Sequence, residues 1–321
     1  MKPQMPLDLA KSKSRDRIGT SAELAAAIGD SEEFIHDVVA RKADHYTSFP
    51  KKKPNGEIRL IEPPKIQLRL LQRRILRLLY LRIRVPGFLH GGLPNRSTLT
   101  HAAQHVGQRM VGTFDLRKFF PTTSPAHVLP VLLEAGFDDE AVALLLELVT
   151  LNGGLPQGSP TSSLLANLAF ICADVRIRAA CWRRGYRYSR FVDDIAISGD
   201  GDISQLKGLV KNVVKETGFQ LADDKTKFRR QGTRQVVTGL VVNDKLRPTK
   251  EFIQQLSDDL HFCQEHGPED LADELGISAT KLKAQLKGRI CHLGQFDARR
   301  ADHFGRLVRY AIKWSALTRV A

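Results

Sequence analysis

Asp193 and Asp194 are the residues whose type and setting point most directly to chemistry in this sequence. Apolar residues surround the pair, with Phe191-Val192 before it and Ile195-Ala196-Ile197 after it. Adjacent carboxylates in such a strand-like run are costly, because like charges repel and burial disfavours each ionised form. A divalent cation removes that cost, so we expect a metal here. The other Asp-Asp pairs stand in polar or helix-terminal surroundings that favour solvated charge, and they are Asp138-Asp139, Asp223-Asp224 and Asp258-Asp259.

Asp115 ends a predicted strand over residues 110–114 and is the third candidate ligand. Phosphoryl transfer to the end of a nucleic acid uses two metal ions about 4 Å apart, which carboxylates from separate strands must hold together. Because adjacent strand residues point to opposite faces, we expect Asp193 to be the closer ligand and Asp194 the more peripheral one. These residues predict a metal-dependent phosphotransferase, a description that also fits a nuclease.

The composition favours a polyanionic partner. The chain of 321 residues has the 42% hydrophobic and 26% charged content of an ordinary globular protein, but its net charge is +14. Nucleic acid is the usual partner of such a charge, and an anionic membrane is less favoured because the cations are spread along the chain. Apolar runs such as 141–146 are far shorter than a membrane span, and no signal-peptide pattern is apparent. No C-x-x-C occurs and a core this large does not need a disulfide framework, so we expect a reduced, cytoplasmic protein. The spread of the cations and the short apolar runs predict no membrane partner.

Turn and periodicity signals outline the elements that would position these residues. A Pro54-Asn55-Gly56 turn between extended segments predicts a basic hairpin over 46–61. A helix begins after Pro63, with Arg73 and Arg77 largely off its apolar stripe, a pattern that a solvated helix face also explains. The later elements are expected to be one apolar helix over 160–181, a strand–turn–strand over 186–198, a helix over 204–217 with Ser204 as N-cap, and a basic helical region from Thr249 onward.

Four segments, in this order, resemble the motifs of reverse transcriptases, and the match runs from about Tyr46 to the C-terminus. These segments are Phe114-Asp115-Leu116 with Phe119-Phe120-Pro121, Leu155-Pro156-Gln157-Gly158-Ser159-Pro160 with Ser162-Ser163, Phe191-Val192-Asp193-Asp194, and Gly218-Phe219 through Lys225-Thr226. The resemblance implies an α+β fold of the right-hand polymerase type. Its parts would be an N-terminal helical extension (1–45), fingers (46–110), a palm of antiparallel sheet packed on helices (111–245, with a helical fingers insertion near 125–165), and a helical thumb (246–321).

The resemblance also assigns roles at matching positions. Asp115, Asp193 and Asp194 would be catalytic and would hold two Mg²⁺ ions, for which Mn²⁺ could substitute. Lys52 and Arg59 would grip the triphosphate of the incoming dNTP, a use suited to a point charge and a forked guanidinium. The other nucleotide-binding residues would be Leu116, Phe120, Gln157, Gly158 and Lys225.

Several of these positions have a defined task and a simpler alternative. Phe120 would be the gate that rejects a 2′-hydroxyl, or else a plain core aromatic. Gly158 would let the backbone approach the nucleotide closely, or else belong to an ordinary loop. Lys225 would protonate the leaving pyrophosphate, or else be a surface lysine. Lys52 and Arg59 could equally be solvated hairpin charges.

Two further segments resemble those of the bacterial retron group. Val237-Thr238-Gly239 matches one signature, and 101–105 (His-Ala-Ala-Gln-His) is similar to an Asn-Ala-x-x-His segment. His101 replaces the asparagine of that pattern, and Phe191 replaces a usual tyrosine. The resemblance implies an enzyme that copies part of its own structured noncoding RNA (msr-msd) into single-stranded DNA, primed from a guanosine 2′-hydroxyl. The product would be branched, and an effector protein would act with the enzyme in phage defence.

RNA or product duplex would be bound through basic and motif residues, and an ordinary soluble helix surface is the alternative for the thumb lysines. The expected contacts are Arg73, Arg77, His105, Thr238, Lys283 and Lys287. Other bacterial reverse transcriptases, of abortive-infection, diversity-generating or unassigned defence type, are the competing hypothesis. A non-catalytic RNA-binding scaffold would have no reason to keep a buried acidic triad, and a nuclease would need neither the hairpin nor the sugar gate.

Overall fold

A computed structural model describes residues 17–52, 56–312 and 314. Its contacts divide the chain into two units, Met1–Thr238 and Gly239–Ala321. The expected boundary between palm and thumb, after residue 245, lies among the short strands that begin the second unit. Most of the predicted Pro-Asn-Gly turn lies outside the described residues, which include only its Gly56.

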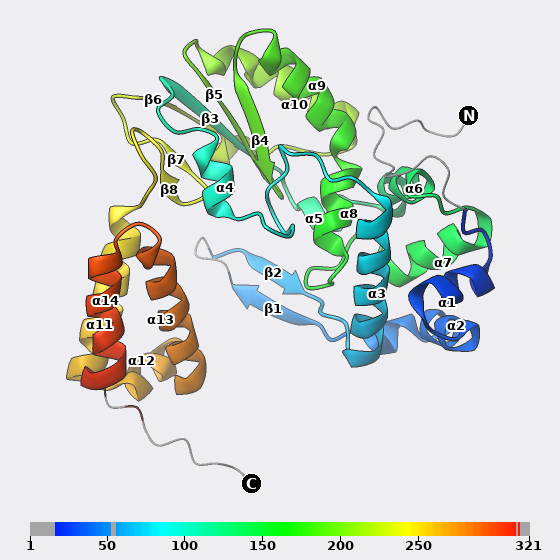
Figure 1. Ribbon diagram of the computed structural model, residues 1–321, viewed down its shortest axis with the longest axis horizontal. Coiled ribbons are helices and arrows are strands. Elements are labelled where there is room, and N and C mark those ends of the chain that lie inside the picture. The colour runs from blue at the N-terminus through cyan, green and yellow to red at the C-terminus, as the bar shows by residue number, and fades with distance from the viewer. Residues whose placement is uncertain (1–16, 53–55, 313, 315–321) are drawn as a thin grey trace. The chain divides into compact units, whose positions relative to one another are not determined.

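The palm sheet is antiparallel, with the strand order β4-β5-β3-β6. Its strands are β3 (Met110–Asp115), β4 (Arg187–Phe191), β5 (Asp194–Gly199) and β6 (Lys227–Arg230). Because cross-strand partners share a face, Phe114 and Ile195 lie together on the apolar face, which α9 (Ile171–Trp182) and α10 (Lys207–Glu216) cover (Figure 1). The next pair, Asp115 and Asp194, lies on the opposite face. The alternation of the strands thus separates the core from the carboxylates.

The remaining elements of the first unit are mostly helices (Figure 1). They are α1 (Ser21–Ile28), α2 (Glu32–Ala40), η1 (Lys42–His45), α3 (Ile66–Arg82), α4 (Thr98–Ala103), α5 (Phe119–Thr122), α6 (Pro125–Glu134), α7 (Asp139–Val149), α8 (Ser162–Ala169), η2 (Ile203–Leu206), η3 (Asp223–Lys225) and the short strand β7 (Val236–Val237). The longer helices among them, such as α3 and α7, contribute to the hydrophobic core of the unit. In α3 the apolar stripe is buried as the periodicity predicts, and Arg73 and Arg77 are exposed.

The predicted basic hairpin is formed by β1 (Phe49–Lys52) and β2 (Ile58–Ile61). The register pairs Lys51 with Arg59 and Lys52 with Ile58. Since directly opposed residues share a face and neighbours alternate, Lys51 lies on the same face as Arg59, whereas Lys52 lies on the other face.

The single apolar helix expected over 160–181 is wrong, because Phe170 separates α8 from α9 with φ −89° and ψ 1°. The Asn167 carbonyl, in the last turn of α8, accepts a bond from the buried Arg190 Nη2 at 2.9 Å. Because the helix ends here, the Asn167 carbonyl is free to accept a hydrogen bond from Arg190 of β4. The N-cap expected at Ser204 is also wrong, because Asp202 precedes η2 and its carboxylate accepts from the Ser204 N–H.

The second unit follows Thr238 and has a hydrophobic core of its own. It consists of β8 (Leu240–Val241), β9 (Arg247–Pro248), α11 (Lys250–Glu265), α12 (Pro268–Glu274), α13 (Ala279–Gly294), α14 (Ala298–Arg306) and η4 (Leu307–Ala311). Leu260 and Leu286 are among its fully buried side chains. Within the residues that the structure describes, none of the helices has both the length and the hydrophobicity needed to cross a bilayer.

Candidate active site

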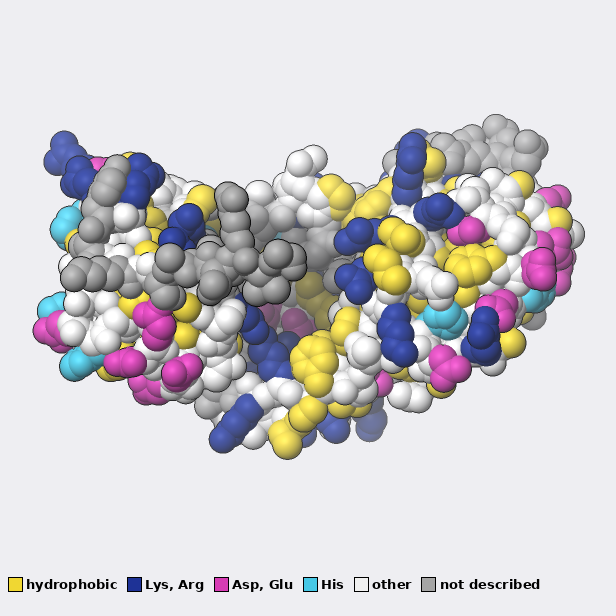
Figure 2. Space-filling view, turned by 90° about the horizontal axis from the view of Figure 1, so that it is seen from below, with side chains coloured by type: hydrophobic (Ala, Val, Ile, Leu, Met, Phe, Trp, Pro, Cys, Tyr) yellow, Lys and Arg dark blue, Asp and Glu magenta, His cyan; other side chains and the backbone are white. Residues whose placement is uncertain are grey.

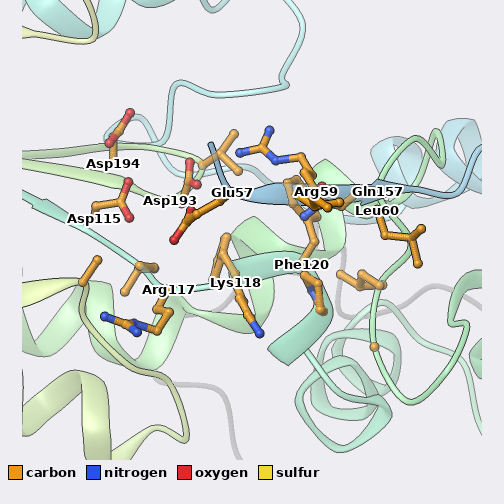
Figure 3. A pocket seen from close by; sticks show the side chains of 18 of the residues that line it. Glu57, Arg59, Leu60, Asp115, Arg117, Lys118, Phe120, Gln157, Asp193 and Asp194 are labelled. Carbon is orange, nitrogen blue, oxygen red and sulfur yellow. The ribbon is translucent and has the colours of Figure 1, made fainter. Parts of the chain in front are cut away.

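A pocket of about 830 Å³ lies within the first unit, at the end of the palm sheet (Figure 3). Strand β2, the end of β3 with α5, the 151–157 loop, the β4–β5 turn and the 222–225 segment line it. All three predicted carboxylates are among its lining residues. Its volume lies in the range usual for sites that bind small molecules, about 300–1,000 Å³.

Backbone pairing brings the carboxylates together. Asp115 and Asp194 are direct cross-strand partners, and Asp193 occupies the turn between β4 and β5. The Leu116 N–H donates to the Asp193 carbonyl at 2.9 Å, and the Ala222 N–H donates to the Asp115 carbonyl at 2.8 Å. Three segments far apart in the sequence are therefore tied to one another beside the pocket.

The electrostatics of these carboxylates are unfavourable. Burial, followed by the charges of Asp193 and Asp115, raises the pKa of Asp194 to about 7. The pKa of Asp193 is raised mainly by burial and further by Asp115, while Arg59 and Lys225 lower it. A cation among these groups would relieve the repulsion.

Lys225 lies among the same charges. Its Nζ donates to Asp115 Oδ1 at 2.9 Å, and this bond raises the pKa of the lysine. The side chain is 44% exposed, so a ligand in the pocket can reach it. Lys225 thus stays protonated at neutral pH beside the carboxylates.

The donor set has the chemistry of a site for hard cations. Carboxylate oxygens are the ligands that Mg²⁺ prefers in proteins, and Mg²⁺ is bound through one or two of them together with substrate phosphates. In the described part of the chain, no three His, Cys, Asp or Glu side chains are arranged so that they could hold a metal ion as they stand.

Neighbouring phenylalanines differ in their surroundings. Phe119 is 2% exposed, and its ring lies against those of Phe170 and Phe219 in the core. Phe120 is only partly buried and lines the pocket. Its backbone carbonyl accepts from the Leu155 N–H at 3.0 Å, which joins it to the loop that precedes Gln157. The structure therefore assigns the core position to the first ring and the pocket position to the second.

The predicted nucleotide-binding residues do not all reach the pocket. Arg59, Leu116 and Gln157 line it, although the Leu116 side chain is buried. Lys52 and Gly158 are not among the described residues that line the pocket.

Gly158 has a reason of its own for being glycine. Its φ is +119°, and a Cβ there would lie 3.2 Å from Pro63 Cα. Next to it, the Glu62 N–H donates to the Gln157 carbonyl at 2.8 Å. The backbone at Gly158 therefore packs closely against Pro63, just after the hairpin, and this contact favours glycine.

The predicted RNA-binding side chains also differ in accessibility. Arg73, Arg77 and Lys287 are exposed, whereas Lys283 lies 4.8 Å from the centre of the Trp314 ring. Thr238 is partly buried, and its hydroxyl donates to the Thr98 carbonyl at 3.4 Å. Figure 2 shows Lys and Arg side chains over many parts of one face of the molecule, often beside hydrophobic ones.

The predicted RNA contact of His105 is wrong, because this side chain is buried. The side chain is 0% exposed, and both ring nitrogens are bonded at 2.7 Å, Nδ1 to Ser198 Oγ and Nε2 to Ser189 Oγ. His105 therefore joins β4 to β5. His101 is also buried; its ring lies 5.9 Å from that of Phe191, and its Nδ1 is 3.3 Å from Thr238 Oγ1. The two segments that suggested the retron group thus contact each other through His101 and Thr238, and the 101–105 segment also contacts the β4–β5 hairpin.

Sequence reasoning missed several residues of this region. Lys51 shares a hairpin face with Arg59, which only the register reveals, but it is not among the described residues that line the pocket. Lys118 lines the pocket and has φ +48°. Arg190 is fully buried in β4, and its one sequence signal is a charge directly before an apolar motif.

Comparison with known proteins gives concordant results. The family model described as reverse transcriptase (RNA-dependent DNA polymerase) matches residues 50–260. Retron Mx65 reverse transcriptase of Myxococcus xanthus is 32% identical over 311 residues, covering 89% of this chain and 70% of the relative. Retron Mx162 reverse transcriptase of the same organism is 30% identical, with coverage of 92% and 67%. Retron Ec86 reverse transcriptase of Escherichia coli is 28% identical, with coverage of 66% and 68%.

Solved structures are less similar. A foamy viral protease-reverse transcriptase in complex with double-stranded DNA has a TM-score of 0.46 and 16% identity, and the chain spans 50% of its length. Telomerase from Candida albicans has a TM-score of 0.44 and 12% identity, and the chain spans 61% of its length.

The buried histidines predict a marked loss of stability in acid. Burial lowers the pKa of His101 to about 3 and that of His90 to about 4, and it lowers the pKa of His105 well below its usual value. Unfolding therefore takes up protons below about pH 6.5, so the stability these groups contribute is present above that pH and is lost as the pH falls.

The substitution His101→Asn should reduce this dependence by about 1.4 kcal/mol per pH unit between about pH 6 and 4, because one fewer proton is taken up. Urea unfolding followed by circular dichroism at several pH values measures the change. The exposed His36→Asn is the matched control and should leave the dependence as it is. An unaltered slope in His101→Asn would show that this histidine does not stay neutral in the folded protein.

Proposed function

The chain belongs to the reverse transcriptase (RNA-dependent DNA polymerase) family, in its retron branch, and we propose that it copies part of its own structured noncoding RNA into single-stranded DNA. As a member of this family it is an RNA-directed DNA polymerase, a nucleotidyltransferase. The observation that carries the proposal is the pairing of Asp115 with Asp194 beside Asp193, in a pocket that the basic hairpin also lines.

We propose that Asp115, Asp193 and Asp194 hold two Mg²⁺ ions, which Mn²⁺ can replace. Bound there, the ions would activate the 3′-hydroxyl (or, at the first addition, a 2′-hydroxyl) and neutralise charge on the pyrophosphate. The raised pKa of Asp194 supports this, since its carboxylate is poorly compensated within the protein. Lys225 stays protonated beside Asp115, so it can donate a proton to the departing pyrophosphate.

The incoming dNTP would occupy the pocket between these carboxylates and the hairpin. Arg59 is exposed on β2 and lines the pocket, so its guanidinium can meet phosphate oxygens with two donors at once. Lys52 would reach the triphosphate only if the hairpin moves, because it lies on the opposite face from Arg59. Phe120 would lie under the sugar and exclude a 2′-hydroxyl by its bulk.

The finer part of the proposal concerns the RNA. The relatives named above are retron reverse transcriptases, and the net charge of +14 suits an enzyme that holds a folded RNA as well as its substrate. We propose that the product is msDNA, single-stranded DNA joined to the RNA by a 2′–5′ linkage. A retron effector protein would be the partner in phage defence.

Sequencing the nucleic acid that co-purifies with the protein tests this function. A branched RNA–DNA molecule, whose DNA is complementary to part of its RNA, is the expected result. Linear DNA copied from an unrelated template, made by an active enzyme, would instead indicate a reverse transcriptase of another lineage.

Loss of the paired carboxylates should abolish synthesis. We expect Asp193→Asn with Asp194→Asn to lower Mg²⁺-dependent DNA synthesis by at least about a thousandfold, because charge at the reacting phosphate is no longer stabilised. RNA binding should persist. The exposed Asp200→Asn, directly after the far end of β5, is the control. Undiminished primer extension by the double variant would remove the catalytic role from both residues.

The gate assignment predicts a change in sugar selectivity. Phe120→Ala should reduce the preference for dNTPs over rNTPs by about 10- to 100-fold, since exclusion of a single hydroxyl by an apolar wall is worth about that much. The ratio of kcat/KM for the two nucleotides measures it within one protein preparation, which cancels any loss of folded enzyme. An unchanged ratio would leave Phe120 without a role in selectivity.

The outer face of α3 predicts a salt-dependent RNA contact. Arg73→Ala with Arg77→Ala should make the slope of log K against log salt shallower by about 1.5–2 units, if each arginine neutralises one phosphate. Arg74→Ala on the same helix is the matched control, because Arg74 already pairs with Asp30. Equal slopes for wild type and the double variant would exclude these arginines from the RNA interface.

A further inference from the structure

Arg190, which directly precedes the catalytic motif, is fully buried and makes five hydrogen bonds. Its Nε and Nη2 donate to the two oxygens of Asp174 at 2.8 and 2.5 Å. Nη2 also donates to the Asn167 carbonyl, and Nη1 donates to Asn167 Oδ1, both at 2.9 Å. The fifth bond runs from Nη1 to the Val192 carbonyl at 2.7 Å. Because a guanidinium has five N–H donors, every donor of this side chain is used.

Val192 is held in an unusual conformation. Its φ is +55°, in the left-handed region, where a β-branched residue is strained. It is also the residue that links Phe191 to Asp193, so its backbone angles set the direction in which the Asp193 carboxylate leaves the turn. Strain of this kind persists only where surrounding contacts impose it.

Asn167, a partner of Arg190, also holds the segment that packs against Val192. Asn167 Nδ2 donates to the Gly91 carbonyl at 2.8 Å. A Cβ on Gly91 would lie 2.4 Å from Val192 Cγ2 and 2.5 Å from the Val192 nitrogen, so only glycine allows this approach. Both backbone groups of Arg190 are also bonded: its N–H donates to the Phe88 carbonyl, and its carbonyl accepts from the His90 N–H.

We propose that Arg190 is a positioning residue that holds Val192 in the left-handed conformation and thereby fixes the Asp193 carboxylate for catalysis. The proposal rests on the proposed function, in which Asp193 is a metal ligand. A core ion pair alone would need only the two donors that meet Asp174. The bond to the Val192 carbonyl, across the strained turn, is the contact that such a pair does not require.

A double-mutant cycle separates positioning from simple stabilisation. Arg190→Lys keeps a buried cation for Asp174 but cannot also span to Val192, so Val192 should relax from its strained conformation. We expect kcat to fall by about 100-fold, the usual cost of a small misplacement of a reacting group, with KM for dNTP changed much less. Val192→Gly removes the strain, because glycine adopts positive φ freely.

The Gly substitution should therefore raise kcat of the Arg190→Lys enzyme by about tenfold relative to its effect in the wild type. Arg187→Lys, the same change on an exposed arginine of the same strand, is the control and should keep the wild-type kcat. Unchanged kcat in folded Arg190→Lys, or strictly additive effects in the cycle, would overturn the proposal.

A second route keeps the proposal testable if Arg190→Lys does not fold. Asn167→Ala leaves the Arg190–Asp174 pair intact while removing the bond to Gly91 and one acceptor of Nη1. Because Asn167 Oδ1 orients the same Nη1 that bonds the Val192 carbonyl, its loss should weaken the hold on Val192, so the same rescue by Val192→Gly is expected and additivity would again overturn the proposal. A wild-type protein without any DNA synthesis would contradict the proposed function itself, whereas an active wild type with an additive cycle would contradict only the role of Arg190.

Discussion

Repulsion among carboxylates at one end of an antiparallel sheet is the constraint on which the first unit depends. The strand register pairs Asp115 with Asp194, and the β4–β5 turn adds Asp193, in surroundings that already disfavour charge. A sheet that relaxed freely would separate them, because the repulsion is relieved by small changes in a turn. The surrounding structure therefore has to hold the strands together against their own charges, and Lys225 offsets only part of that cost.

The β4–β5 hairpin is held from both faces of the sheet, by two different sets of side chains. On the apolar face, Arg190 reaches α8 and α9 and returns to the turn. On the opposite face, His105 joins β4 to β5 through two serine hydroxyls, and its burial keeps it neutral. Alternation along the strands makes this division possible, since neighbouring residues serve opposite faces. Rigid support of this kind is what a site needs when its geometry must be kept within a fraction of an ångström.

Local patterns were enough to predict β3, the β4–β5 hairpin, the basic hairpin and the buried stripe of α3, because period and turn chemistry act over a few residues. They did not predict β6, an edge strand of the palm sheet. They were not enough where a distant contact decides. The helix break at Phe170 accompanies a bond from Arg190, which lies on another element. The spacing of His101 and His105 predicts a shared helix face, but α4 ends at Ala103. Packing against β4 and β5 buries His105 and contradicts its predicted RNA contact.

The same reasoning explains why the site could be predicted only in part. Asp115 and the 193–194 pair could be found because charged residues in an apolar stretch are unusual. The face on which Lys52 lies depends instead on the strand register, which the local sequence pattern does not determine. Arg190 was missed because the partners that reveal its role, Asp174 and Asn167, lie on other elements, and its one sequence signal is a charge directly before Phe191-Val192. Reactive residues can be found from sequence because their charges lack partners in their surroundings. The charges of residues that position them are fully paired, so those residues can be identified only in the folded chain.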